Sequence, residues 1–251
     1  GGSAAAVADG LVPIAEGTDA GGSIRIPAAW CGCYGYRASV GRIPLVIRPN
    51  AFAGDTPFIF EGPISRTVQD AALSLKALAG PDPRDPYSLD DEIDFTAADR
   101  RSLEGWKIAY SPNFDVFPIE PVVAETVARA VAAFSEAGAT VEEVQLGIAR
   151  SHLELAELWC RLVMPVGLEA CDNFKLYGID LLKDHRADLP PEYLAWADRC
   201  YDMRVLDLFR DQQVRSEIFD ALQGVFADYD FLVTPTLACM PVDNAADGNT
   251  L

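Results

Sequence analysis

A serine ends a glycine-rich segment near the start of the chain, Gly17-Thr18-Asp19-Ala20-Gly21-Gly22-Ser23. Glycines allow tight turns and leave the backbone N–H groups open to a ligand. A serine hydroxyl exposed beside several N–H groups suits acyl transfer, because the hydroxyl attacks a carbonyl and the N–H groups stabilise the resulting oxyanion. Ser23 is therefore the candidate nucleophile, although spacing alone fits a purely structural turn equally well.

A serine nucleophile needs a base, since its hydroxyl is weakly acidic. The chain has two histidines, His152 and His185, in a stretch that we expect to be helical and without a recognisable acidic partner. A Ser-His-Asp triad is therefore not favoured. A phosphate-binding loop is not favoured either, because it would need a lysine after the glycines and a helix beginning there. Residues 24–27, Ile-Arg-Ile-Pro, do not look like the start of a helix.

The neighbouring stretches predict the elements that position this segment. Ser3 is the expected N-cap of a first short helix. Residues 11–15 are expected to form a short buried strand that leads into the glycine-rich turn. In residues 66–79 small and apolar side chains recur at helical spacing, and Thr67 and Asp70 resemble a capping box. The nucleophile is thus expected in a loop that follows a strand.

The second half of the chain predicts an α/β arrangement. Residues 106–110 resemble a strand, a helix is expected from about Pro121, and residues 140–144 resemble the returning strand. Such a unit implies parallel strands with a right-handed crossover. Residues 148–226 are expected to be mostly helical, and residues 230–236 to form one more buried strand. We therefore expect an α/β fold, with a mixed, largely parallel sheet covered by helices on both faces.

Composition excludes several classes of function. The formal net charge is −18, from 38 acidic and 20 basic residues, which disfavours binding to nucleic acid or to an anionic membrane surface. No apolar stretch approaches the length of a transmembrane helix, and no signal peptide opens the chain. Six scattered cysteines indicate reduced thiols and a cytoplasmic protein. Cys31-Gly32-Cys33 lacks a second ligand pair at metal-binding spacing, so no metal is expected.

Residues 17–27 resemble the signature of the amidase-signature family, Gly-Thr-Asp-x-Gly-Gly-Ser-Ile-Arg-x-Pro, and match it at every fixed position. Residues 1–8 resemble the end of the family's glycine–serine loop and the helix after it. Residues 28–42 resemble its continuation, except that Arg37-Ala38-Ser39 replaces the usual Lys-Pro-Thr, and residues 62–70 resemble a further block. The resemblance covers most of the chain.

This resemblance implies a hydrolase that cleaves the carbon–nitrogen bond of a small amide or carbamate-like substrate through an acyl-enzyme at Ser23. It implies no metal and no organic cofactor. The implied oxyanion hole consists of the backbone N–H groups of Ala20, Gly21, Gly22 and Ser23. Thr18, Asp19 and Arg25 match positions that brace the nucleophile loop.

The family uses a Ser-cisSer-Lys triad, in which a second serine relays the proton to a lysine. Both groups are expected upstream of the position that matches Gly1, so this sequence matches neither. We therefore expect residues 1–251 to be part of a single amidase-signature domain that lacks its N-terminal and C-terminal parts. The helical section at residues 148–226 corresponds to the family's variable region, which shapes the substrate entrance.

Two alternatives stay open. One is an amidotransferase subunit of the same family, which would release ammonia from glutamine for a partner protein. The other is a non-catalytic fragment that acts as a binding or folding unit, consistent with the unmatched lysine and relay serine. The resemblance to the family also allows a homodimer.

Overall fold

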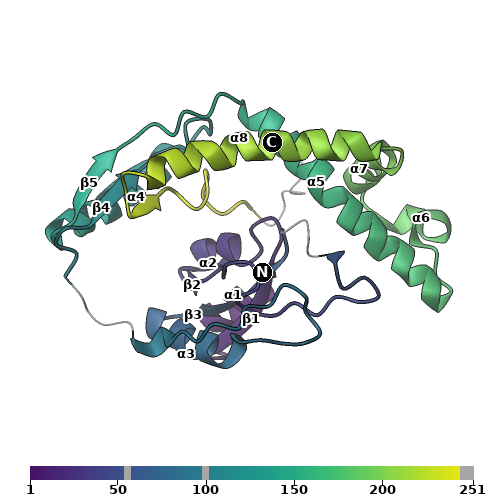
Figure 1. The fold of residues 1–251 in the computed structure, drawn as a ribbon, viewed down its shortest axis with the longest axis horizontal. Helices are drawn as coiled ribbons and strands as arrows, with labels where there is room; N and C mark the ends of the chain where they lie inside the picture. Colours follow the sequence, from purple (N-terminus) through teal and green to yellow (C-terminus); the bar gives the residue numbers. More distant parts are fainter. Residues whose placement is uncertain (54–57, 98–101, 244–251) are drawn as a thin grey trace. The chain divides into compact units, whose positions relative to one another are not determined.

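The computed structural model describes residues 1–53, 58–97 and 102–243. The chain divides into two compact units, Gly1–Arg101 and Ser102–Leu251. Figure 1 follows the chain from the purple first unit to the green and yellow helices of the second. The glycine-rich segment belongs to the first unit, and the predicted βαβ unit belongs to the second.

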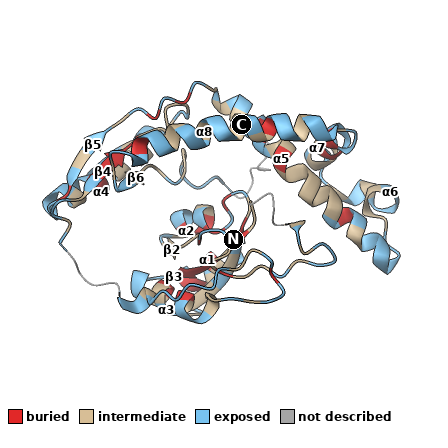
Figure 2. Ribbon diagram, viewed as in Figure 1, coloured by how far each residue is buried: buried red, intermediate tan, exposed pale blue. Residues whose placement is uncertain are grey.

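The first unit contains a three-stranded antiparallel sheet in the order β1-β3-β2. These strands are β1 (Ile14–Asp19), β2 (Tyr34–Gly35) and β3 (Phe60–Ser65). The register pairs Asp19, the last residue of β1, with Phe60, the first residue of β3. The central strand β3 is mostly buried, as its red segment in Figure 2 shows. The sheet therefore holds the end of β1 rigidly where the glycine-rich turn begins.

Two short helices, α1 (Gly2–Ala8) and α2 (Arg25–Cys31), pack near this sheet. One small apolar core joins them to it, consisting of Ala4, Val7, Ile24 and Ile64. Ile24 and Val7 are fully buried. The segments before and after the glycine-rich turn are thus fixed by the same core.

The prediction for the first elements needs two corrections. The N-cap of α1 is Gly1, whereas the Ser3 hydroxyl donates to the Glu16 carbonyl at 3.1 Å. The first strand begins at Ile14, not at residue 11, and continues to Asp19. Pairing with β3 keeps the strand extended, so residues 17–19 of the glycine-rich segment are strand and residues 20–23 are turn.

The next helix, α3, spans Val68–Leu78, and Thr67 is its N-cap. The Thr67 hydroxyl accepts the N–H of Asp70 at 3.1 Å, which confirms the predicted helix and its capping residue. A turn of 3-10 helix, η2 (Phe95–Ala97), packs against α3.

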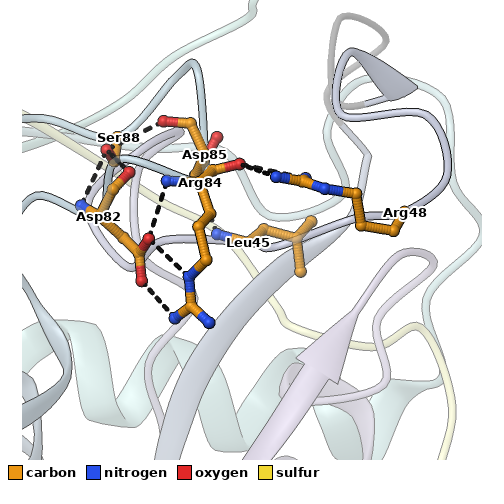
Figure 3. Close-up of polar contacts among 6 residues, drawn as sticks. All are labelled: Leu45, Arg48, Asp82, Arg84, Asp85 and Ser88. Atoms are coloured by element: carbon orange, nitrogen blue, oxygen red, sulfur yellow. Dashed lines mark hydrogen bonds and ion pairs between the residues drawn. The ribbon is translucent and has the colours of Figure 1, made fainter.

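Aspartates organise the loop after α3 (Figure 3). Asp82 forms an ion pair with Arg84 at 2.6 Å and accepts its backbone N–H. The buried Asp85 accepts the N–H of Leu45 at 2.9 Å, and Arg48 donates to the carbonyl of Arg84. These contacts fasten the proline-rich loop to a segment about 40 residues earlier in the chain.

The second unit contains a parallel three-stranded sheet in the order β5-β4-β6. β4 (Lys107–Tyr110) and β5 (Thr140–Glu143) pair in parallel, and α4 (Pro121–Glu136) connects them. This confirms the predicted βαβ unit. β6 (Phe231–Val233) lies on the other side of β4, also in parallel.

The last strand is shorter and more exposed than predicted. β6 has three residues, and Phe231 is 47% exposed. In the described part of the chain β6 is an outer strand of its sheet, so one of its edges is not covered by another strand. The Phe231 ring stacks on Trp106, with 4.9 Å between the ring centroids.

The section between β5 and β6 is helical, as predicted. A capping box of Ser151 and Glu154 starts the first long helix, and the ion pair of Arg161 and Asp211 joins the two longest helices. The elements are α5 (His152–Asn173), η3 (Phe174–Tyr177), α6 (Leu181–Asp184), η4 (Arg186–Asp188), α7 (Pro191–Tyr201) and α8 (Val205–Phe226).

The α/β class is confirmed, with antiparallel strands in the first unit and parallel strands in the second. Within the described ranges no helix is both long and apolar enough to cross a bilayer. All six cysteines are free thiols, and Cys171 and Cys200 are buried.

Candidate active site

The candidate nucleophile Ser23 lies in a strand–turn–helix connection. β1 ends at Asp19, α2 begins at Arg25, and Ser23 is exposed between them. The prediction that residues 24–27 cannot start a helix was wrong. Pro27 is the third residue of α2, and a proline is tolerated in the first helical turn because its missing N–H would have no partner within the helix.

Gly22 has a backbone conformation that favours glycine. Its φ angle is +111°, and a Cβ atom at this position would lie 2.5 Å from Cδ1 of Ile26. The Gly22 carbonyl accepts the N–H of Ile26 at 2.7 Å. The turn therefore depends on a residue without a side chain just before the nucleophile.

Asp19 braces the turn on both sides of Ser23. Its side chain is fully buried. One carboxylate oxygen, Oδ1, accepts the N–H of Gly22 and Nη2 of Arg25, both at 2.8 Å. The other, Oδ2, accepts Nε of Arg25 at 2.9 Å and the N–H groups of Ile24 and Arg25 at 3.3 Å. The predicted pair of Asp19 and Arg25 is therefore present, and the carboxylate also caps the start of α2.

These contacts decide the charge of Asp19. Burial raises the pKa of the carboxyl, but the hydrogen bonds from Arg25 and from the Gly22 N–H lower it more, to about 2. The Asp19 carboxylate is therefore ionised at neutral pH.

The four N–H groups expected to form an oxyanion hole are not equivalent. The Gly22 N–H donates to Asp19. In the ranges that the structure describes, no hydrogen bond engages the N–H groups of Ala20, Gly21 and Ser23. Within the described residues these three N–H groups thus have no hydrogen-bond acceptor, whereas the Gly22 N–H holds the turn in place.

Ser23 faces an open hollow of about 420 Å³ on the surface of the first unit. Thr18 contributes to its lining from β1, where it pairs across the sheet with Glu61. Burial and the nearby Glu16 carboxylate raise the pKa of Glu61. The hollow is lined by Gly1, Ser3, Glu16, Gly17, Thr18, Ser23, Glu61 and Ile64.

A family model named Amidase matches residues 1–250 of this chain. The chain belongs to the amidase family. The glycine-rich segment with Ser23 lies within the matched residues.

Relatives and solved structures agree with this assignment. The chain is 34% identical over 237 residues to an acylamidase of Rhodococcus erythropolis, and the match covers 93% of this chain and 47% of the relative. It is 34% identical over 272 residues to a glutamyl-tRNA(Gln) amidotransferase subunit of Latilactobacillus sakei, covering 100% of this chain and 54% of the relative. The crystal structure of a bacterial aryl acylamidase of the amidase-signature family matches with a TM-score of 0.94 and 46% identity, over 99% of this chain and 51% of that one.

The chain therefore spans about half the length of the curated amidase-family relatives that it matches. The amidotransferase relatives show that some members of the family are subunits of larger assemblies.

Arg37 is a site residue of this amidase-family chain that sequence reasoning missed. Its Nε atom lies 4.0 Å from Oδ1 of Asp19, and its guanidinium carbon lies 3.3 Å from the centroid of the Phe60 ring. The signal available in the sequence was the departure from the family pattern at residues 37–39, but nothing there indicated that the side chain reaches Asp19.

The histidines belong to the second unit. The expectation that neither histidine has a partner was wrong for His185, whose Nδ1 lies 3.3 Å from Oδ2 of Asp188. His152 packs near Phe117. Across the described parts of this amidase-family chain, no group of three or more histidine, cysteine or acidic side chains is arranged to hold a metal ion.

Proposed function

We propose that this protein is an amidase that hydrolyses the carbon–nitrogen bond of a small amide or carbamate-like substrate through an acyl-enzyme at Ser23. The observation that carries the proposal is the exposed Ser23 hydroxyl in a rigid turn, close in sequence to three N–H groups that no hydrogen bond engages within the described residues. The match to the Amidase family supports it.

In the proposed reaction the Ser23 hydroxyl loses its proton to a base, and Oγ attacks the substrate carbonyl carbon. The N–H groups of Ala20, Gly21 and Ser23 stabilise the oxyanion. The carbon–nitrogen bond then breaks, and the leaving amine takes a proton. Water attacks the ester that remains on Ser23, releases the acid and restores the hydroxyl. No organic cofactor or metal takes part in these steps.

Asp19, Arg25 and Thr18 have supporting roles in this proposal. Asp19 fixes the turn through Gly22 and the first N–H groups of α2, while Arg25 holds the carboxylate ionised. Thr18 forms part of the wall of the hollow beside Ser23. The base is assigned to the serine and lysine of the family triad, which match no position in this sequence.

A fluorophosphonate probe tests the nucleophile directly. We expect a single adduct on Ser23 in the natural full-length gene product, located by peptide mass spectrometry, and no adduct after Ser23→Ala. Ser3→Ala is the matched control, because Ser3 lines the same hollow but its hydroxyl donates to the Glu16 carbonyl. An adduct that remains after Ser23→Ala, or no adduct in the natural protein, contradicts the proposal.

An amidotransferase component is the second candidate, supported by the relatives of that name. The higher identity to the aryl acylamidase structure, 46% against 28% for the structure of a glutamyl-tRNA(Gln) amidotransferase subunit from Thermotoga maritima, favours the amidase. Ammonia released from glutamine faster than from simple amides would reverse this preference.

Three finer proposals, on compartment, oligomeric state and binding partner, accompany the main one. The six free thiols support a reducing compartment, the cytoplasm. A homodimer stays a prediction, for which sedimentation of the natural protein is the measurement. The strong negative charge supports a neutral small molecule, not nucleic acid or a membrane surface, as the binding partner.

A further inference from the structure

The Arg37 side chain contacts both Phe60 and Asp19, the residue that braces the nucleophile loop. The strand β2 ends at Gly35, and the Tyr36 N–H donates to the carbonyl of Pro63 at 3.0 Å, so the chain still runs beside β3. This path brings the Arg37 guanidinium onto the face of the Phe60 ring. Phe60 is itself 7% exposed and pairs with Asp19 across the ladder.

Asp19 thus has two cationic neighbours that differ in exposure. Arg25 makes the direct hydrogen bonds, but its side chain is 49% exposed, and water screens an exposed ion pair. The Arg37 side chain is 31% exposed, and its Nε approaches the same oxygen, Oδ1, that accepts the Gly22 N–H. Arg37 Nε therefore lies 4.0 Å from the carboxylate oxygen that accepts the Gly22 N–H.

We propose that Arg37 is a positioning residue for the Ser23 loop, which acts through Asp19 and not through the substrate. Its positive charge holds Oδ1 in the place where that oxygen accepts the Gly22 N–H. Its planar guanidinium stays in place because it lies over the Phe60 ring, a favourable cation–π arrangement. The inference rests on the proposed role of Ser23 as the nucleophile.

Two substitutions separate the positive charge of Arg37 from the shape of its side chain. A lysine at this position keeps the positive charge that attracts Oδ1 but loses the flat guanidinium. A methionine keeps apolar contact with Phe60 and loses the charge. If the charge acts on Asp19, lysine preserves the turn and methionine does not.

The same unit offers a matched control. Arg42 also combines a carboxylate partner, Asp91 at 2.7 Å, with an aromatic ring, Phe95 at 5.9 Å. Its hydrogen bonds go to both carboxylate oxygens of Asp91 and thus away from the Ser23 turn. Arg42→Met therefore removes a similar set of contacts from the first unit without acting on Asp19.

The experiment compares Arg37→Met, Arg37→Lys and Arg42→Met in the natural full-length gene product. The first readout is amide hydrogen exchange at Gly22 and Ile24, whose N–H groups donate to Asp19. The second is the rate at which a fluorophosphonate labels Ser23, together with kcat and KM on an amide substrate. Thermal unfolding of each variant shows how much of any change comes from general destabilisation.

For Arg37→Met we expect exchange at Gly22 to rise and labelling and kcat to fall by about fivefold, with KM unchanged, the size expected for a partly exposed charge pair. In Arg37→Lys the exchange at Gly22, the labelling of Ser23 and kcat should stay within about twofold of the wild type. Arg42→Met should lower the unfolding temperature and leave both readouts unchanged. If Arg37→Met does not fold, Arg37→Gln, which also lacks the charge, replaces it with the same expectations.

Unchanged Gly22 exchange in the uncharged variant overturns the inference, and so does a lysine variant as impaired as the uncharged one. These outcomes are separate from failure of the proposed function. If Ser23 is never labelled, the proposed nucleophile is wrong, while Gly22 exchange still decides whether Arg37 acts on Asp19.

Discussion

Each unit of the molecule contains an aspartate that holds a loop by accepting backbone N–H groups, and the two differ in how far away their partners lie. Asp19 accepts N–H groups from residues three to six positions later. Asp115 accepts those of Leu146, Gly147 and Ile148, which are 31 to 33 positions later. Asp19 also has arginine neighbours, whereas these donors to Asp115 are all backbone groups.

We call Asp19 a local brace, because its partners lie in one turn, and Asp115 a tertiary tie, because it joins two segments that are distant in the sequence. Asp19 fixes one turn and leaves Ser23 exposed beside it, so its main effect should be on reactivity. Asp115 joins the loop after β4 to the segment after β5, and its own φ angle of 65° is unusual for a residue other than glycine. Its main effect should be on the stability of the second unit.

The largest expected effect comes from Asp19→Asn. An asparagine has nearly the same size, but it cannot accept all the N–H groups that Asp19 accepts, and it leaves Arg25 without this carboxylate. We expect Ser23 labelling to fall about a hundredfold, the size known for a small misplacement of reacting groups. Stability should fall by about 2 kcal/mol, less than for a fully buried ion pair, because Arg25 is half exposed.

Urea denaturation and the labelling rate measure these two quantities separately. Asp115→Asn is the control, because it alters the corresponding side chain of the other unit. If labelling falls equally in the two variants, once the folded fraction is taken into account, Asp19 has no specific effect on the reactivity of Ser23.

The same contrast explains what could be predicted from the sequence. The Asp19–Arg25 pair and Ser23 lie within eleven consecutive residues, so a family signature contains all three. The βαβ unit was also predictable, because strand 107–110 and its return are joined by a helix whose apolar side chains recur at regular spacing. Short-range patterns are visible in one sequence without an alignment.

The errors came where a distant partner decides the structure. Pairing with β3 extends β1 into the glycine-rich segment, and the Asp19 carboxylate caps the start of α2 at Ile24 and Arg25. Neither contact can be deduced from the local preference of Gly17 or Pro27. The contact of Arg37 with Asp19 was missed for the same reason, since 18 positions separate them.

The second prediction concerns the tie. Asp115→Ala should destabilise the second unit by about 2 kcal/mol, because three N–H groups lose their acceptor. Only some of these N–H groups can donate to water instead. Asp115→Asn should cost about half as much, since asparagine keeps one acceptor and tolerates the left-handed backbone. Chemical denaturation followed by tryptophan fluorescence measures both, and an alanine variant no less stable than the asparagine variant would contradict the tie.

The smallest expected effect is the pH dependence of the stabilisation by Asp19. The pKa of Asp19 is lowered to about 2 in the folded protein, from an ordinary value near 3.8 in the unfolded chain. A depressed pKa stabilises the folded state above the unfolded value, and this contribution disappears as the pH falls through the folded value. The difference in unfolding free energy between wild type and Asp19→Asn should therefore be constant above about pH 4 and shrink between about pH 4 and pH 2. Urea denaturation at a series of pH values measures it. A difference that stays constant down to pH 2 would mean that the charge of Asp19 does not contribute to the brace, and that the shape of its side chain alone holds the turn.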